Sequence, residues 1–329
     1  MSAQDQTFEQ YQGLMQINAA SHLIRVGRQA GLLSALREGQ RTLDQLCEQL
    51  SLVPESTSLL LDGLVATGII EKYEDDFALS RAAHLLCQYD QDLGDSQWEQ
   101  LASQLKNNDR ANRDDQLRFN YQAATQWIHT PAAMQAAEIL DIGGEGEVSG
   151  PKILDLGCGS AVWSIAMAHQ DPEATILAVD ISVAIEAATN TAQSIGLGDR
   201  FQTLEVNPAD PSLRSVEFPK ADFDIVLLAQ RISGLGSKVA EDLLKKSIEA
   251  LKPNGRLVVI DLFRGPTKPN LAESAEALKL DLSTQEGHIR TLESTQALFA
   301  QMGLQRVQFA FLAASKVNMG MAVGEKPSS

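Results

Sequence analysis

The sequence predicts an α/β protein in which a mostly parallel, doubly wound sheet fills the C-terminal half and a smaller helical domain precedes it. Three observations support this prediction. Residues 152–169 form an apolar strand that passes through two glycines into an Ala- and Met-rich helix. Strand-like and helix-like segments then alternate to the end of the chain, which is typical of a doubly wound sheet. Before that region, residues 43–80 have the pattern of two helices followed by a β-hairpin.

The chain is acidic and long enough for two domains, each with its own core. It has 329 residues and a formal net charge of −16 at pH 7. Nucleic acids and anionic membranes both require basic surfaces on their partners, so we expect neither as the main partner. The three cysteines are not spaced for a metal site, and none is expected. The polar N-terminus and the lack of a long apolar run indicate a soluble protein of the reducing cytoplasm.

The N-terminal region is predicted to form a winged helix. An amphipathic helix comes first, and two further helices at 43–50 and 55–67 are separated by a proline turn. Gly68 ends the second of these, and the strands IIEKY and FALS enclose two aspartates as a hairpin. A helix-turn-helix followed by a hairpin is a pattern found in DNA-binding regulators.

The charges of this region do not fit DNA. Residues 1–90 contain twelve acidic side chains against six basic ones. The expected recognition helix, ESTSLLLDGLVAT, has no basic residue that could contact a phosphate. Its apolar positions are better suited to another protein surface.

Residues 91–150 are interpreted as a polar helical connector, and the alternating strands and helices follow it. The expected strands are 152–156, 175–180, 201–206, 224–228 and 256–263. The helix before the fifth strand is expected to end at the turn 253–255, and a last helix leads into an antiparallel hairpin.

The turn after the first strand carries the clearest chemical signal. Gly157 and Gly159 expose bare backbone at a helix N-terminus, where no Cβ atom obstructs a ligand. Asp155 adds a carboxylate at the strand tip. Asp180, 25 positions later, ends the second strand where it can accept hydrogen bonds from a ribose diol. Val162 stands where a dinucleotide enzyme has its third glycine, which makes a nicotinamide cofactor the weaker interpretation.

The run DLGCGSAV with Asp180 after it resembles motif I and the acidic second-strand motif of class I S-adenosylmethionine-dependent methyltransferases. The N-terminal segment is similar to the dimerisation domain of small-molecule O-methyltransferases. The matching positions are Gly39, Thr42, Leu46, Cys47, Leu59, Leu60, Leu64, Gly68, Ile69 and Ile70. The resemblance implies a Rossmann-like methyltransferase domain at 151–329, with a mostly parallel doubly wound sheet and an antiparallel last strand. It also implies a winged-helix dimerisation domain at 1–90 and a connector at 91–150 that lines the acceptor pocket.

For the cofactor, the resemblance implies S-adenosyl-L-methionine, with S-adenosyl-L-homocysteine as its product. The residues that the family's motifs place around it are Asp155, Gly157, Cys158, Gly159, Asp180, Ile181, Asn207 and Gln230. Asn207 replaces the family's aspartate beside the adenine amino group. Its amide oxygen can still accept a hydrogen bond, without charge assistance, and Asp210 is the alternative acid.

On the acceptor side, the resemblance implies a pocket lined by the connector. The candidates are Tyr121, Trp127, His129 and Met134. Trp127 and Met134 have an equally good interpretation as core residues. His129, beside a Thr-Pro turn, has a second interpretation as a capping or surface residue.

The chain departs from the family after the fourth strand, where the O-methyltransferases carry a histidine as general base. Ser233 stands at or beside that position, and a neutral serine cannot take a phenolic proton unaided. A positioned base contributes a factor of roughly 10² to 10⁴ in rate, but an acceptor that is already anionic does not need one. Arg231 could hold such an anion, although a surface salt bridge is its plainer interpretation, and His288 is a candidate substitute base.

We therefore predict a dimeric S-adenosylmethionine-dependent methyltransferase that acts on a small aromatic or polyketide-like molecule, with oxygen as the first expected methyl acceptor. A relative that methylates carbon or nitrogen, or that binds the cofactor without transferring methyl, is the alternative. A ligand-sensing regulator built on the winged helix is a third hypothesis, which the acidic N-terminal region disfavours.

Overall fold

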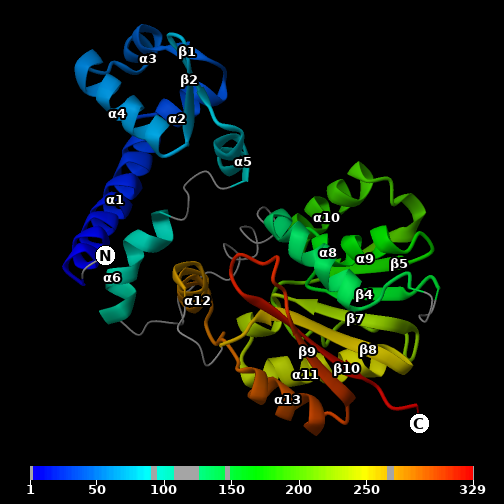
Figure 1. Cartoon of the computed structure of the whole chain (residues 1–329). Coiled ribbons are helices and arrows are strands. Elements are labelled where there is room, and N and C mark those ends of the chain that lie inside the picture. Colours follow the sequence, from blue (N-terminus) through cyan, green and yellow to red (C-terminus); the bar gives the residue numbers. More distant parts are fainter. Residues whose placement is uncertain (1–2, 90–94, 107–125, 145–148, 265–269, 329) are drawn as a thin grey trace. The chain divides into compact units, whose positions relative to one another are not determined.

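The computed structural model of the protein describes residues 3–89, 95–106, 126–144, 149–264 and 270–328. The chain divides into two compact units, Met1–Gln100 and Leu101–Ser329 (Figure 1). Each unit has a hydrophobic core of its own. Within the described ranges, no helix has the length and apolar character that crossing a membrane requires.

The first unit is a helical domain with a small antiparallel sheet. Its elements are α1 (Ala3–Gln29), α2 (Leu32–Arg37), β1 (Arg41–Thr42), α3 (Leu43–Leu50), α4 (Pro54–Ala66), β2 (Ile70–Tyr73), β3 (Asp76–Leu79), α5 (Arg81–Tyr89) and α6 (Asp95–Lys106), the last of which extends past Gln100. The strands pair in the order β1-β3-β2. The helices predicted at 43–50 and 55–67 and the hairpin after them are present, so the element order expected for this region is confirmed.

Local sequence explains where two of these helices begin. The side chain of Thr42 accepts a hydrogen bond from Gln45 N, and Gln45 Oε1 accepts one from Thr42 N at 2.9 Å, which caps the start of α3. Pro54 occupies the first turn of α4, where no helical partner is lost through its missing N–H. Leu61 and Leu64 of α4 are fully buried in the core that α2, α3 and the hairpin complete.

The second unit is an α/β domain. Its described elements are η2 (Gln126–His129), α8 (Thr130–Ile139), β4 (Lys152–Leu156), α9 (Val162–Gln170), β5 (Thr175–Asp180), α10 (Ser182–Ser194), η3 (Gly198–Arg200), β6 (Phe201–Glu205), β7 (Phe223–Ala229), η4 (Ile232–Gly234), α11 (Ser237–Ala250), β8 (Leu251–Leu262), α12 (Leu271–Ser283), α13 (Leu292–Gln301), β9 (Gln305–Phe311) and β10 (Met319–Glu325).

The sheet of this unit has seven strands in the order β6-β5-β4-β7-β8-β10-β9. The pairs from β6 to β8 are parallel, whereas β10 is antiparallel to both β8 and β9. The strand order reverses beside β4, whose neighbours are β5 and β7, and ligands of open α/β sheets bind at the carboxyl ends of such strands. The predicted fold class, including its antiparallel last strand, is confirmed.

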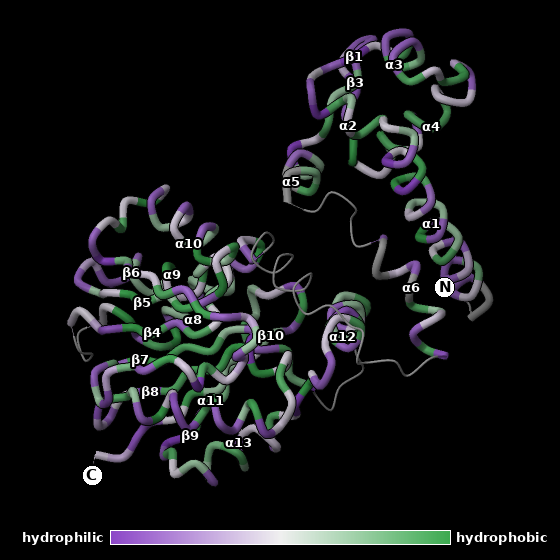
Figure 2. Tube along the Cα trace, turned by 180° about the vertical axis from the view of Figure 1, so that it is seen from behind, coloured by the Kyte–Doolittle hydropathy of each residue, from purple (hydrophilic) through white to green (hydrophobic). Residues whose placement is uncertain are grey.

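Helices cover both faces of this sheet (Figure 1). Because side chains alternate along a strand, Ile153 and Ile225 belong to the core formed with α8, α9 and α10, while Leu154 and Val226 belong to the core formed with α11 and α13. Burial on both faces requires nearly continuous apolar strands, and Figure 2 shows the hydrophobic colouring of the central strands.

The start of β8 differs from the prediction. The preceding helix, expected to end at 253–255, ends at Ala250, and the strand begins at Leu251. Asn254 adopts a φ of 62°, and the pairing of β8 with β7 shifts register nearby. The segment that looked like a turn is therefore a bulge inside a longer strand.

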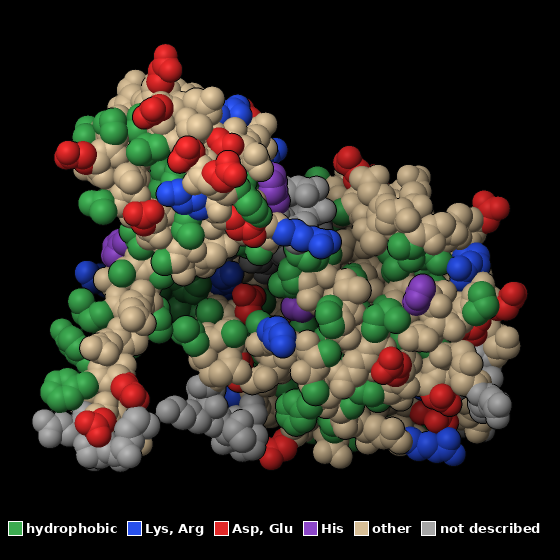
Figure 3. Space-filling view, turned by 45° about the horizontal axis from the view of Figure 1, so that its top comes forward, with side chains coloured by type: hydrophobic (Ala, Val, Ile, Leu, Met, Phe, Trp, Pro, Cys, Tyr) green, Lys and Arg blue, Asp and Glu red, His purple; other side chains and the backbone are tan. Residues whose placement is uncertain are grey.

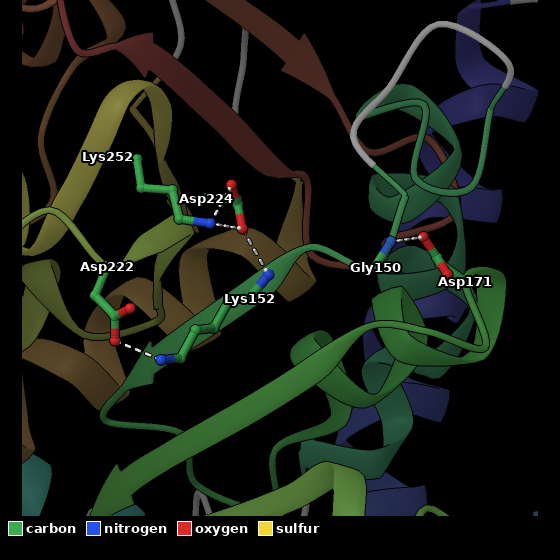
Figure 4. Close-up of polar contacts among 6 residues, drawn as sticks. All are labelled: Gly150, Lys152, Asp171, Asp222, Asp224 and Lys252. Carbon is green, nitrogen blue, oxygen red and sulfur yellow. Dashed lines mark hydrogen bonds and ion pairs between the residues drawn. The ribbon is translucent and has the colours of Figure 1, made fainter.

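Charged side chains join the strands at the amino end of the sheet (Figure 4). Lys152 N donates to Asp224 Oδ2 at 2.9 Å, and Lys252 Nζ lies 2.9 and 2.8 Å from the two oxygens of Asp224. Lys152 Nζ also pairs with Asp222. These contacts fasten β4, β7 and β8 at the edge opposite their carboxyl ends.

Candidate functional site

A tight glycine turn follows β4 at the point where the strand order reverses. Gly157 and Gly159 have φ values of 77° and 57°, a region that favours glycine. A Cβ on Gly157 would lie 2.6 Å from Arg231 Cδ, and one on Gly159 would lie 2.5 Å from Gln126 Oε1. Gly157 N donates to Val179 O at 2.8 Å, which ties the turn to β5. A substitution at either glycine would therefore combine a disfavoured φ with a close side-chain contact.

Two carboxylates lie against this turn. Asp180 accepts hydrogen bonds from Gly159 N at Oδ2 and from Ile181 N at Oδ1, both at 2.8 Å. Asp155 is buried and accepts from Ser164 Oγ at 2.5 Å through Oδ2. Its Oδ1 has no hydrogen-bond partner among the described residues. Burial raises the pKa of Asp155 to about 7, although the hydrogen bond from Ser164 opposes this shift and the charge of Asp180 adds to it.

Gln126 contacts the glycine turn through Ser160, and the sequence analysis did not predict it as a site residue. Its buried side chain accepts hydrogen bonds at Oε1 from Ser160 N at 2.9 Å and from Ser160 Oγ at 3.3 Å. Its Nε2 donates to Gln230 Oε1 at 3.2 Å. An acceptor oxygen thus lies at the N-terminus of α9, where unpaired backbone N–H groups attract one. Gln126 has no sequence signal, because it comes from the connector, far from the glycine motif in the chain.

His129 and Gln230 meet beside this turn. Gln230 has a φ of 55°, and its Nε2 lies 3.3 Å from His129 Nε2. The His129 ring stacks on Trp163 with centroids 5.9 Å apart, and Trp163 Nε1 has no hydrogen-bond partner among the described residues. Burial lowers the pKa of His129 to about 4, so the ring is neutral at pH 7. His129 is the N-cap residue of α8, as one interpretation expected, but its side chain makes no capping hydrogen bond to the helix.

Other predicted cofactor residues lie in different surroundings. Asn207 is exposed, and its Oδ1 accepts from Ala209 N at 2.9 Å in a local turn. Asp210 accepts hydrogen bonds from the backbone and side chain of Ser215 in the same loop. Cys158 is buried, and burial raises the pKa of its thiol well above the usual value, as do the charges of Asp180 and Asp155. Cys158 is therefore a protonated packing residue of the turn, not a nucleophile.

Of the predicted acceptor-pocket residues besides His129, Trp127 is 37% exposed and Met134 is half-buried against the core of α8 and α9. Met134 thus takes part in packing, whereas Trp127 is too exposed for a core residue. Tyr121 lies outside the described residues.

The three candidate catalytic residues occupy different places. Arg231 is buried, and its Nη2 donates to Pro211 O at 2.9 Å, so it does not lie at the surface as its sequence context favoured. Ser233 is also buried; its N–H donates to Asp261 Oδ2 at 2.9 Å, and its side chain bonds to the same carboxylate. Burial raises the pKa of Asp261. His288 is exposed, and its backbone N–H donates to Ser233 O at 2.8 Å.

A cavity of about 730 Å³ lies beyond the carboxyl end of β8, and His288 is part of its wall. The lining residues are Leu262, Arg264, Glu273, Ser274, Ala277, Leu278, Leu280, Asp281, His288 and Ile289. This volume is within the range of small-molecule sites. Arg264 and α12 carried no signal in the sequence analysis.

The groups around the glycine turn fit the predicted cofactor. The turn leaves backbone exposed at a helix N-terminus, Asp180 presents a carboxylate at the tip of β5, and Asp155 Oδ1 is a buried acceptor without a partner among the described residues. A ligand with a ribose diol, a carboxylate and cationic groups matches these donors and acceptors.

Residues 153–255 match the protein family described as "Methyltransferase domain". Malonyl-[acyl-carrier protein] O-methyltransferase of Paenibacillus sp. (strain JDR-2) is 30% identical over 118 residues, which are 34% of this chain and 42% of that protein. L-tyrosine C(3)-methyltransferase of Streptomyces lavendulae is 29% identical over 130 residues, 40% of this chain and 32% of that protein. The chain spans about half the length of the curated relatives it matches, or less.

Solved structures share the fold along the whole chain. An O-methyltransferase family protein from Burkholderia thailandensis has a TM-score of 0.72 at 17% identity, and the likeness covers 100% of this chain and 99% of that one. Human N-acetylserotonin methyltransferase in complex with S-adenosylmethionine has a TM-score of 0.71 at 16% identity, with 99% of each chain covered. Residues 153–255 therefore match a methyltransferase domain, and the chain shares the fold of these solved methyltransferase structures.

Proposed function

We propose that this protein transfers a methyl group from S-adenosylmethionine to a small aromatic or polyketide-like molecule, with oxygen as the first expected acceptor. The observation that carries the proposal is the buried carboxylate of Asp180 bonded to the glycine turn, inside the region that matches a methyltransferase domain. The O-methyltransferases named above support the class of reaction.

Each part of the donor would find a partner in this site. Asp180 would hold the ribose diol, the N-terminus of α9 at Ser160 would hold the methionine carboxylate, and Asp155 would attract a cationic group. Gly157 and Gly159 would allow the ligand to lie against the backbone. When bound, S-adenosylmethionine supplies an electrophilic methyl group on a sulfonium sulfur.

The cavity at the end of β8 is the proposed acceptor site. It lies at the same edge of the sheet as the glycine turn, because β4, β7 and β8 are parallel and β7 pairs with both of the others, with Ala229 opposite Ile260. Neighbouring strands lie about 4.8 Å apart. Tyr121, Trp127, His129 and Met134 stay candidates for the part of the acceptor site that the connector forms.

A homodimer through the N-terminal unit is part of the proposal, and we interpret this unit as a winged helix adapted for dimerisation. Five apolar side chains of α1 are more than half exposed: Phe8, Tyr11, Leu14, Met15 and Ile17. Figure 3 shows hydrophobic and acidic side chains gathered over this unit, which favours a protein partner over nucleic acid. The free cysteines among the described residues support a reducing cytoplasm as the location.

Methylation of carbon is the second candidate function. Two relatives are named for it, L-tyrosine C(3)-methyltransferase and the bacteriochlorophyllide d C-20 methyltransferase of Chlorobaculum tepidum. Formation of S-adenosylhomocysteine would separate both methylating functions from a cofactor-binding relative without methyl transfer, and mass spectrometry of the product would separate oxygen from carbon.

The experiment that tests the proposal is calorimetric titration of S-adenosylmethionine into wild type, Asp180→Ala and Asp242→Ala. Loss of a charged hydrogen-bond acceptor should cost roughly 1.5 to 3 kcal/mol, or about ten- to hundredfold in affinity. Asp242 forms ion pairs on the surface of α11 and serves as the matched control. Wild type that does not bind S-adenosylmethionine would overturn the proposal, and so would equal binding by Asp180→Ala.

A further inference from the structure

The cavity at the end of β8 has an apolar wall suited to a ring system. Leu262, Leu278, Leu280, Ile289 and Ala277 contribute aliphatic surface from the end of β8, from α12 and from the segment after it. Burial of an apolar ligand surface against such a wall is favourable by about 25 cal/mol per Å². The wall accounts for affinity, but the polar lining residues decide which ring systems bind.

The acidic lining residues already have partners. Glu273 accepts a hydrogen bond from Asn318 Nδ2 at 3.1 Å and lies in the first turn of α12, where the helix dipole favours a negative charge. Asp281 also has a polar or electrostatic contact. Neither carboxylate therefore requires a cationic ligand for compensation.

Arg264 is in the opposite situation. Its backbone is held, because Arg264 N donates to Arg290 O at 2.9 Å and a β-bridge pairs Arg264 with Thr291. Its guanidinium makes no hydrogen bond or ion pair with any residue that the structure describes. The other arginines described in this unit all form such contacts through their side chains: Arg200, Arg214, Arg231, Arg256, Arg290 and Arg306.

The group that would remove an acceptor proton is also missing from the expected position. Ser233 is buried and bonded to Asp261, and Asp261 is itself buried and is not among the described residues that line the cavity. An acceptor that arrives ionised already has the electron pair that forms the new bond to the methyl carbon. The sulfonium sulfur keeps the electron pair of the bond that breaks, so no proton has to leave during the transfer.

We propose that the acceptor is an organic anion with an apolar ring body, and that Arg264 is the residue that binds its charged group. A guanidinium can bind a carboxylate or an ionised enol through two parallel hydrogen bonds, and the held backbone of Arg264 reduces the freedom lost on binding. This inference rests on the proposed function, since it names the substrate class of the same enzyme. It replaces Arg231 by Arg264 as the anion-binding residue.

The test uses a matched pair of ring compounds, 1-hydroxy-2-naphthoate and its uncharged amide, 1-hydroxy-2-naphthamide. Each is titrated by calorimetry into full-length wild type, Arg264→Ala, Arg264→Lys and Arg306→Ala, with and without saturating S-adenosylhomocysteine. Arg306 pairs with Glu325 on the neighbouring strand and controls for the loss of a surface positive charge. Thermal unfolding checks that each variant is folded.

We expect wild type and Arg306→Ala to bind the acid about tenfold more tightly than the amide. Arg264→Ala should bind both compounds equally within about twofold, and Arg264→Lys should lie between. Wild type without a preference for the acid, including wild type that binds neither compound, would overturn the inference, as would an unchanged preference in Arg264→Ala. If wild type preferred the acid but did not bind S-adenosylhomocysteine, the anion site would be supported and the proposed function would be wrong.

Discussion

The two halves of the proposed site are held in different ways. At the ends of β4 and β5, backbone groups and buried carboxylates form the surface, and a Cβ on either glycine would approach a neighbouring side chain within 2.6 Å. At the end of β8, the surface consists of side chains from α12 and its flanking segments, and both Arg264 and His288 are exposed. Single substitutions change a backbone surface only by disturbing its packing, whereas they change a side-chain surface directly. The donor half should therefore be sensitive to substitutions that alter packing, and the acceptor half to substitutions that alter charge.

The largest expected effect is on the glycine turn. In Gly157→Ala, a φ of 77° costs about 1–2 kcal/mol for a residue with a Cβ, and that atom also displaces the Arg231 side chain from 2.6 Å. We expect affinity for S-adenosylmethionine, measured by calorimetry, to fall about a hundredfold. Gly196→Ala is the matched control, since Gly196 has a φ of 73° and open space around its Cβ position. If Gly196→Ala lost as much affinity for S-adenosylmethionine as Gly157→Ala, the loss in Gly157→Ala would reflect general destabilisation and not the glycine turn.

The second prediction concerns the buried Asp155. Its pKa of about 7 in the folded protein lies above the ordinary value of 3.8, so its stabilising contribution is complete below about pH 4 and is lost as the pH rises through 7. Asp155→Asn cannot titrate. Relative to wild type, its free energy of unfolding in urea should therefore improve between pH 5 and pH 8, on the order of 1–3 kcal/mol. The exposed Asp199→Asn is the carboxylate control, and a parallel pH dependence of Asp155→Asn and wild type would contradict the prediction.

A smaller effect is expected from Gln126→Ala. The substitution leaves Ser160 N without its acceptor and should lower the free energy of unfolding by about 1–2 kcal/mol. Because a bound cofactor carboxylate would replace that acceptor, the rise in Tm on adding S-adenosylmethionine should be larger in the variant than in wild type. Gln135→Ala is the control, since Gln135 Oε1 accepts from Ala314 N at 2.9 Å away from the turn. If S-adenosylmethionine raised the Tm of Gln126→Ala and of wild type equally, the prediction would be wrong, and Gln126 would not take part in the donor site.

The smallest effect is expected from His288→Asn. The carboxylate of 1-hydroxy-2-naphthoate is ionised at neutral pH. Methyl transfer to that carboxylate, followed as S-adenosylhomocysteine and methyl ester formed, should therefore change in rate less than about threefold. A general base contributes roughly 10² to 10⁴. A loss of that size would identify His288 as the base and would weaken the argument for an anionic acceptor.

Prediction from the sequence succeeded where neighbouring residues determine the structure. The strand, glycine turn and helix around Asp155 and the carboxylate of Asp180 at the next strand tip follow from local apolar patterns and glycine positions. The antiparallel last strand was expected from the family resemblance. The prediction of a turn at 253–255 was wrong. Proline and glycine indicate a turn, but in the folded protein this segment is a bulge within β8, which pairs with β7.

The sequence by itself determined the order of the elements, the fold class and the position of the glycine turn, since these depend on periodicities within a few residues. Only the tertiary structure decided that Gln126 and His129 meet Gln230 and that Ser233 faces a buried Asp261. It also decided that the Arg264 guanidinium lies at a cavity beside α12 with no polar partner in the described part of the chain. These contacts join side chains that are 28 to 104 positions apart in the chain. Local sequence patterns cannot predict contacts between residues so far apart in the chain, because the packing of whole helices and strands brings these side chains together.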